Sequence, residues 1–572
     1  MRLVGMDYKW VALSNTTLGT LMATINGSIL LIALPDIFRG LRIDPLAPGN
    51  SGYLLWLILG FLVVGAVLLV SLGRLGDIFG RVRMFNLGFV VFTLFSILLS
   101  VTWMSGGAGA LWLIVMRMGQ GVGGALLFAN SSAILTDAFP RDQRGLALGV
   151  NGIAFVGGSF LGLVLGGVLA PVDWRLIFLV SVPIGVLGTF WAYHSLRELG
   201  ERHAARIDWW GNATFALGLV GVLVGITYGI QPYGGHSMGW TSPFVLATLT
   251  GGTALLVLFC AIELHVDEPM FHLDLFRIRA FAAGNLAALL AAMGRGGLQF
   301  ILIIWLQGIW LPEHGYDFAR TPLWAGIYML PLLAGFLVTG PISGWLSDKL
   351  GARPFATGGM ALAAASFLLL IVIPVNFPYP VFALVLLLNG ISTGLFIPPN
   401  NAAVMNSLPP SQRGAGAGML ATSMNSAAVL SIGVFFTLMI VGLASGLPHA
   451  LEGGLIAHGV PATDAARVSS LPPVATLFAS LLGYNPMATL LGPHVLARLP
   501  AGQARQVAGR SFFPHVISAP FHTALVYAFG FAIAACVVAA VASLLRGGKY
   551  HHVEESASAA APARLGSVEE AA

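Results

Sequence analysis

The stretch "GRLGDIFGRVR" at residues 73–83 decides the fold, because the chain repeats it as "GWLSDKLGARP" at residues 344–354. The two copies share glycine, leucine, aspartate and glycine at equal offsets. A second pair of related stretches follows at a matched distance, "FPRDQRGLALG" from Phe139 and "LPPSQRGAGAG" from Leu408. Two related pairs at matched separation indicate duplicated halves of about six helices each.

The chain around these repeats is strongly apolar. Of its 572 residues, 57% are hydrophobic and 9% are charged, whereas soluble domains carry about 25% charged residues. Apolar runs of about 20 residues, long enough to cross a hydrocarbon core of ~30 Å, recur about fourteen times. The first run, Trp10 to Ile37, is too long for a signal-peptide core and is expected to be retained. The sequence therefore predicts an all-α polytopic membrane protein.

The repeats also predict the domain organisation. We expect an N-terminal six-helix bundle at 1–208, two linker transmembrane helices at 209–264 and a C-terminal six-helix bundle at 265–545. A long extracytoplasmic loop is expected at 446–523 and a disordered cytoplasmic tail at 546–572. Because lysine and arginine collect in alternate loops, we expect both termini to be cytoplasmic.

The repeated loops are candidate conformational switches. Their glycines allow a tight turn between helices, and Asp77 supplies a carboxylate that can pair at a helix end. A basic loop with a chance acid is the alternative, but the recurrence of the pattern favours a functional loop. The predicted switch residues are Gly73, Asp77, Gly80 and Arg81 in the first loop, and Gly344, Asp348, Gly351 and Arg353 in the second.

Two arginines lie inside apolar runs, Arg117 in "LIVMRMGQGVGGA" and Arg295 in "AALLAAMGRGGLQFILIIWLQ" at 287–307. A charge at the bilayer centre costs about 2.5 to 3.5 kcal/mol on insertion scales, so such a residue usually faces a protein interior or a wet cavity. The functional interpretation is a cavity-lining arginine. The alternative is a structural arginine bound to backbone carbonyls.

Glycines recur in "GGSFLGLVLGGVL" from Gly157. Gly158, Gly162 and Gly166 stand four residues apart on one helix face, and Gly167 adjoins them. Such a ridge of small residues lets a neighbouring helix approach closely. We expect these glycines to pack helices, and packing alone explains the pattern.

Together with "DWRLIFLVSVPIG" from Asp173, these motifs resemble the fourteen-helix drug/proton antiporter family of the major facilitator superfamily. The resemblance implies the major facilitator fold, two six-helix bundles plus two extra helices, with a substrate cavity between the halves. It also implies that Arg117 lines the cavity near the proton path and that the Gly73 loop steadies one side of the switch.

Two departures limit what the resemblance implies. The family's first helix usually carries an intramembrane aspartate, but "TINGSILLIALP" has Asn26 there. The glycine ridge usually continues as Gly-Pro, but Leu163 follows Gly162. Because an asparagine does not titrate, the usual proton site is absent.

The repeat offset places Arg295 near the position equivalent to Thr24 and Asn26. We therefore expect Arg295 to make the cavity electropositive, with Gln299 one turn beyond it. The predicted substrate cavity and coupling residues are Asn26, Arg117, Gln120, Arg295 and Gln299.

The resemblance implies a secondary active transporter that exports small hydrophobic or amphipathic compounds, drugs included, by alternating access and with proton coupling. The alternative cargo is an anionic metabolite or lipid, because two arginines without a membrane carboxylate favour negative charge. An enzyme is not expected, since the sequence has no paired acids and no metal-binding or phosphate-cradling motif. The expected partners are a small-molecule substrate, protons or another coupling ion and the lipid bilayer, with no nucleic acid, cofactor or metal, in a monomer.

Overall fold

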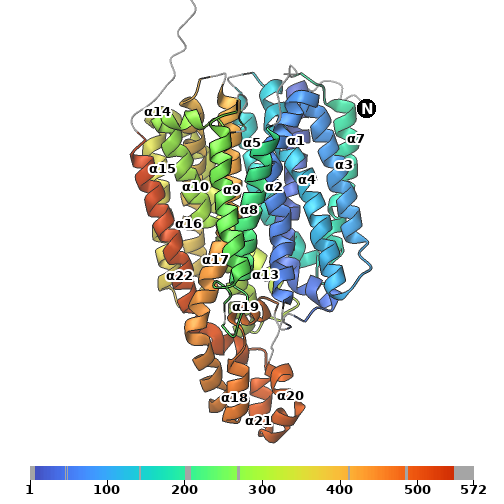
Figure 1. Cartoon of the computed structure of the whole chain (residues 1–572), viewed down its shortest axis with the longest axis vertical. Coiled ribbons are helices and arrows are strands. Elements are labelled where there is room, and N and C mark those ends of the chain that lie inside the picture. The colour runs from blue at the N-terminus through green and yellow to red at the C-terminus, as the bar shows by residue number, and fades with distance from the viewer. Residues whose placement is uncertain are drawn as a thin grey trace, which may run out of the picture.

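Figure 1 shows the computed structural model of the chain, an elongated bundle of helices. The structure describes residues 7–44, 47, 49–140, 143–199, 208–236, 238–266, 269, 271–409, 412–482 and 487–546. Apart from Arg546, the tail expected to be disordered lies outside these residues. The described part contains 14 helices long and apolar enough to cross a membrane. The predicted all-α polytopic fold with fourteen spanning helices is thus confirmed.

The first half of the chain supplies six spanning segments. They are α1 (Tyr8–Leu41), α2 (Asn50–Phe79), α3 (Arg81–Ser100), α4 (Gly106–Ala138), α5 (Arg144–Leu169) and the pair α6 (Leu176–Leu179) and α7 (Ser181–Ser195). The glycine ridge of α5 packs on α1, and a Cβ at Gly162 would collide with the Ile25 carbonyl oxygen. Only a residue without a side chain permits so close a backbone approach.

Two further helices, α8 (Trp209–Gly229) and α9 (Pro243–Glu263), follow the first half. They pack against each other, and α8 also contacts α2 and α17. Asp208 caps α8, since its carboxylate accepts a hydrogen bond from the Gly211 amide at 2.8 Å. A short 3₁₀ helix, η1 (Leu273–Arg277), then leads into the second half.

The second half repeats the arrangement with broken helices. Its first spanning segment consists of α10 (Arg279–Arg295), α11 (Leu298–Trp305), the π-helix η2 (Leu306–Trp310) and α12 (Leu311–Glu313). The others are α13 (Thr321–Tyr328) with α14 (Leu330–Leu350), α15 (Ala352–Val372), α16 (Tyr379–Asn406), α17 (Arg413–Ala457) and α22 (Phe512–Leu544).

The segment 446–523, expected as a loop, is largely helical where it is described. Helix α17 continues through Pro448, and α22 begins at Phe512 and continues through Pro520. Between them lie α18 (Ala462–Ser469), α19 (Pro473–Leu481), α20 (Met487–Arg498) and α21 (Ala501–Val507). Both helices continue through their prolines because packed neighbouring helices make a proline tolerable where it would otherwise tend to break a helix.

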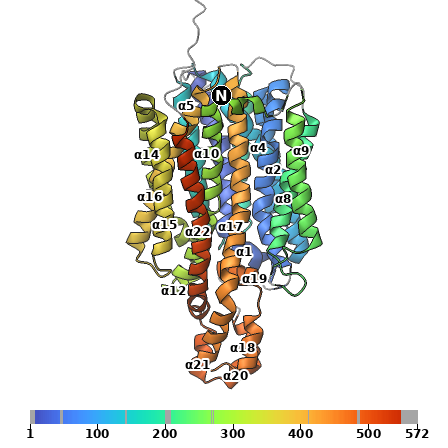
Figure 2. The same ribbon diagram turned by 60° about the vertical axis from the view of Figure 1, so that its left-hand side comes forward.

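The bundle has two distinct ends, seen in Figures 1 and 2. The cap end carries α18, α20 and α21 beyond the main bundle, and the loop end carries the Gly73 and Gly344 loops. The halves touch near the cap end, where a Cβ at Gly167 of α5 would collide with the Leu323 Cα of α13. Gly326 of α13 faces the Leu163 backbone in the same region. The two halves are therefore closed against each other at the cap end.

Candidate functional site

A buried polar network occupies the middle of the first half. Arg117 of α4 donates through Nη1 to Asn26 Oδ1 at 2.5 Å, to the Asn26 carbonyl oxygen at 3.2 Å and to Gln120 Oε1 at 2.7 Å. The Arg117 side chain is 1% exposed, and Asn26 and Gln120 are fully buried. Three residues that the sequence proposed separately are thus brought together.

The network extends to two serines that the sequence analysis missed. Gln120 Nε2 donates to Ser96 Oγ of α3 at 2.8 Å, and Asn26 Nδ2 donates to Ser181 Oγ of α7 at 2.9 Å. The Arg117 guanidinium also lies 4.5 Å from the centre of the Phe61 ring. Amide and hydroxyl dipoles and an aromatic face therefore solvate this charge in place of a carboxylate. In this conformation Arg117 is enclosed by protein.

Arg295 has a different environment at the end of α10. Its Nη2 donates to Thr393 Oγ1 of α16, whereas its Nη1 is buried without a hydrogen-bond partner among the described residues. One turn later, Gln299 Nε2 is also buried without a partner in the described chain. Arg295 itself is only partly buried. Each arginine thus keeps a buried N–H group that no described residue accepts, Nε of Arg117 and Nη1 of Arg295. Arg117 nevertheless donates three hydrogen bonds to described residues, whereas Arg295 donates one.

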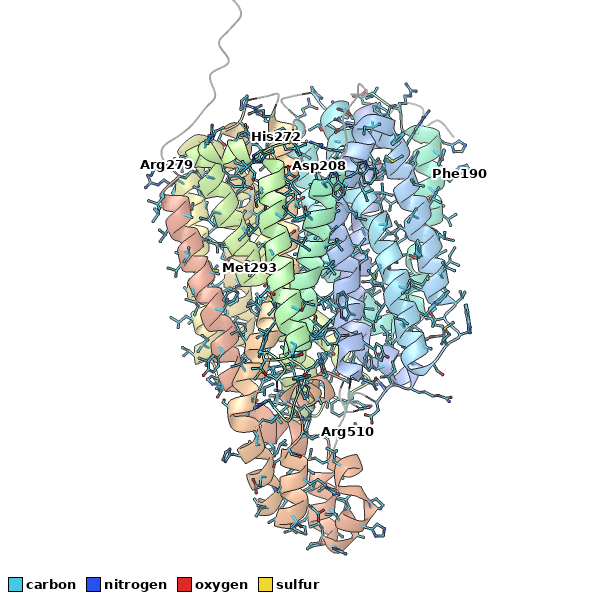
Figure 3. The ribbon with its side chains drawn as sticks, viewed as in Figure 1. Phe190, Asp208, His272, Arg279, Met293 and Arg510 are labelled. Carbon is cyan, nitrogen blue, oxygen red and sulfur yellow. The ribbon has the colours of Figure 1, made fainter. Side chains whose placement is uncertain are left out.

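The helix breaks immediately after Arg295, at Gly296 and Gly297. Ser431 of α17 bridges the break, since its hydroxyl accepts from the Gly297 amide at 3.0 Å and donates to the Met293 carbonyl at 2.5 Å. Figure 3 places Met293 near the middle of the main bundle. A side chain of the neighbouring helix thus satisfies backbone groups freed at membrane depth, as a broken spanning helix requires.

An apolar pocket adjoins this break. Its walls come from α11, α17 and α19, and the space between them is too narrow for a water molecule. The lining residues are Gly297, Phe300, Ile301, Ile304, Ile432, Phe435, Phe436, Met439 and Leu477. The second half therefore places a closed patch of aromatic and aliphatic side chains at the helix break, beginning at Gly297 two residues after Arg295.

The internal repeat is visible in the hydrogen bonds. Asn389 Nδ2 of α16 donates to Ser366 Oγ of α15 at 2.8 Å, which matches the Gln120 to Ser96 bond between α4 and α3. The spacing between the related stretches that begin at Phe139 and Leu408, added to the residue number of Gln120, reaches Asn389, so it could have predicted this bond in the second half from the sequence. Where α4 carries Arg117, however, the same spacing reaches Leu386 on α16. The halves thus keep the same helix-tying bond but hold their arginines on different helices.

The two switch loops share one backbone feature. Gly80 has φ of +108° and Gly351 has φ of +89°, a region that residues with a side chain rarely adopt. Each glycine amide donates to the carbonyl four residues earlier, Gly76 or Ser347, at 2.9 Å. These equivalent turns join α2 to α3 and α14 to α15.

The first switch loop carries an ion-pair network. Arg81 binds Asp77 of α2 at 2.8 Å and Asp137 of α4 at 2.7 Å, and Glu198 accepts from the Arg81 amide at 2.8 Å. The sequence analysis left Asp137 and Glu198 out of the site, because they lie 56 and 117 residues from Arg81.

The second switch loop differs. Arg353 is exposed and has no ion pair among the described residues, and the side chain of Asp348 lies outside them. A Cβ added at Gly73 would lie 3.7 Å from the Ala129 Cβ, and one added at Gly344 would lie 3.7 Å from the Pro398 Cβ. Both are ordinary contact distances. Among the described side chains, the ion pairs of the two switch loops therefore lie in the first half.

We predict that Asp77→Asn slows turnover about fivefold with little change in equilibrium cargo binding, because loss of about 1 kcal/mol from one conformational state changes a rate by that factor. Rates and binding constants should be measured in parallel. Arg83→Gln is the matched control, since Arg83 is exposed in the same loop without an ion pair in the described chain. A large loss of affinity at unchanged turnover would contradict a switching role.

The model of the Major Facilitator Superfamily matches residues 16–211 and 202–432. The methyl viologen resistance protein SmvA of Salmonella typhimurium is 30% identical over 82% of this chain and 91% of its own length. The riboflavin transporter RibZ of Clostridioides difficile is 29% identical over 75% and 88%. The multidrug transporter protein MdtP of Bacillus subtilis is 25% identical over 84% and 83%.

Solved structures agree on the fold. A bacterial homologue of the human lysosomal transporter Spinster aligns with a TM-score of 0.58 at 14% identity, covering 95% of this chain and 99% of that chain. The xylose transporter XylE of Escherichia coli, a proton:xylose symporter, aligns with a TM-score of 0.52 at 16% identity, covering 82% and 95%. On the extent of the family match and the duplicated helical halves, the chain belongs to the Major Facilitator Superfamily and is a membrane transporter.

Proposed function

We propose that this transporter exports small hydrophobic or amphipathic compounds by alternating access, as a member of the fourteen-helix drug/proton antiporter family. In this proposal the loop end and both termini face the cytoplasm, and the cap end faces outward. The basic loops support that orientation, since lysine and arginine collect in cytoplasmic loops. The contact of the halves at the cap end then corresponds to a conformation closed to the outside.

The observation that carries the proposed cargo class is the apolar lining next to the helix break that follows Arg295. Its side chains are closed against one another in this conformation. Once they separate, aromatic and aliphatic walls favour an apolar body, and Arg295, two residues before Gly297 in the chain, is the polar group that fixes its orientation. The names of SmvA and MdtP, a resistance protein and a multidrug transporter, support the same class. RibZ, a relative at similar identity, is by its name a riboflavin transporter.

A second candidate cargo is an anionic metabolite or lipid. The specific observation in its favour is the Arg295 Nη1 group, buried without a partner among the described residues. A carboxylate or phosphate would supply the missing acceptor and neutralise the charge. Purified protein in liposomes, challenged with cationic, neutral and anionic amphiphiles, distinguishes the two. If the protein transports no compound of these three classes, the proposed export function is wrong.

Any proton coupling is expected to bypass the first helix. Asn26 binds Arg117 and does not titrate, whereas Asn26→Asp would place a titratable carboxylate in the same position. We therefore predict that a pH gradient drives cation export more strongly in Asn26→Asp than in the wild type, measured in liposomes with a clamped membrane potential. Asn26→Ser is the control that changes size without adding an acid. Equal proton drive in wild type and Asn26→Asp would refute the prediction.

A further inference from the structure

Helix α19 is an apolar nine-residue helix in the segment between the last two spanning helices. Its sequence, "PVATLFASL", has no charged residue. At about 1.5 Å per residue it is too short to cross a membrane. All nine residues are nevertheless buried, and Phe478 and Ala479 are completely inaccessible. This helix is therefore packed into the protein rather than lying on its surface.

The contacts of α19 come from both halves of the transporter. It contacts α2 of the first half and α11, η2 and α17 of the second. Figures 1 and 2 show it at the cap end of the main bundle, between that bundle and the projecting helices α18, α20 and α21. An element that touches both halves has to lose one set of contacts when the halves separate at this end.

The firmest contacts of α19 are with the second half. Ser480 Oγ donates to the Gly308 carbonyl of η2 at 3.2 Å, and a Cβ at Gly308 would lie 2.9 Å from the Ser480 carbonyl oxygen. The Phe478 ring lies 5.5 Å from the Phe436 ring of α17. Leu477 forms part of the wall of the apolar pocket beside the helix break. This side of α19 also covers η2, where the Gln307 side chain is 1% exposed.

We infer that α19 is a plug that closes the outward exit between the halves and leaves its seat against α2 each time the exit opens. This inference rests on the proposed alternating access and orientation. It assigns the closure of the exit to a helix of the segment 446–523, in addition to the spanning helices α5 and α13. Apolar burial holds the plug in place, because nine buried residues would otherwise expose their surface to water.

The test measures access from outside to a cysteine behind the plug. In a Cys260→Ser, Cys536→Ala background, Gln307→Cys is labelled in intact cells with a membrane-impermeant maleimide. We expect slow labelling in the parent and about tenfold faster labelling after Phe478→Ala, because a truncated core aromatic weakens the packing that seats α19. Gly308→Leu, which forces the Ser480 backbone away from η2, should have the same effect without altering α19.

Leu491→Ala is the matched control, because Leu491 is buried to a similar degree in α20, away from the contact with α2. Folded yield and thermal stability are measured for each variant. Unchanged labelling in folded Phe478→Ala and Gly308→Leu would overturn the plug, and so would equal acceleration by Leu491→Ala. The assay uses no cargo, so faster labelling without transport of any tested compound would retain the plug and reject the proposed export function.

Discussion

Replacing Arg295 with glutamine is expected to leave the protein folded but to reduce transport of its cargo by about 10- to 150-fold, the range that corresponds to a charge-assisted hydrogen bond of about 1.5 to 3 kcal/mol. The fold should survive because Thr393, the described partner of Arg295, also donates its hydroxyl to the Asn389 carbonyl at 2.9 Å. Initial rates in liposomes, normalised to folded yield, give the measurement.

Two further variants sharpen this test. Arg295→Lys should retain part of the activity, since the charge remains but the planar fork is lost. Arg277→Gln is the control, an exposed arginine of η1 without an ion pair in the described chain. Acidic or zwitterionic amphiphiles should compete better than cations if the cargo is anionic. Wild-type rates for every compound in folded Arg295→Gln would show that Arg295 is not a cargo site.

Replacing Arg117 with methionine is expected to destabilise the protein rather than to change its cargo preference. The substitution leaves Asn26 Oδ1 and Gln120 Oε1 without their donor in a fully buried site. Each buried acceptor left unpaired costs about 1 to 3 kcal/mol. The thermal midpoint of purified protein in detergent should therefore fall clearly, and unfolding in denaturant should give the size of the loss.

A double-mutant cycle isolates the cause. Asn26→Leu removes the acceptor, so the double variant Arg117→Met with Asn26→Leu should be more stable than the sum of the two single losses predicts. Arg175→Met is the control, because Arg175 is a more exposed arginine that likewise lies over an aromatic ring, that of Trp174. Strict additivity, or a stable Arg117→Met variant with altered cargo selection, would reject a structural role for Arg117.

The sequence predicted more of the fold than of the site. The length of an apolar run and its low charge are local properties of the sequence. Together they mark a spanning helix. The repeat of the Gly73 loop at Gly344 then fixed the duplication, and the positive φ at Gly80 and Gly351 gives that repeat its backbone reason. Helix ends near proline were placed less well, because tertiary packing decides whether a proline ends a membrane helix.

Less of the candidate site than of the fold could be predicted from the sequence. Arg117 and Arg295 look alike in sequence, each a single cation in an apolar run, and nothing local distinguishes them. Their partners lie far away in the chain: Asn26 is 91 residues from Arg117, and Thr393 is 98 residues from Arg295. The number of acceptors that each guanidinium meets therefore depends on how the helices pack.

By itself the sequence determined that this protein is a duplicated helical membrane transporter, because hydrophobic length and a repeated motif are written in local stretches of residues. Tertiary structure alone decided that Arg117 donates three hydrogen bonds and Arg295 one to described residues, and that α19 is buried between the halves. The physical reason is that hydrogen bonding and burial belong to pairs of residues brought together from distant segments, and the free energy of each pair exists only once the helices have packed.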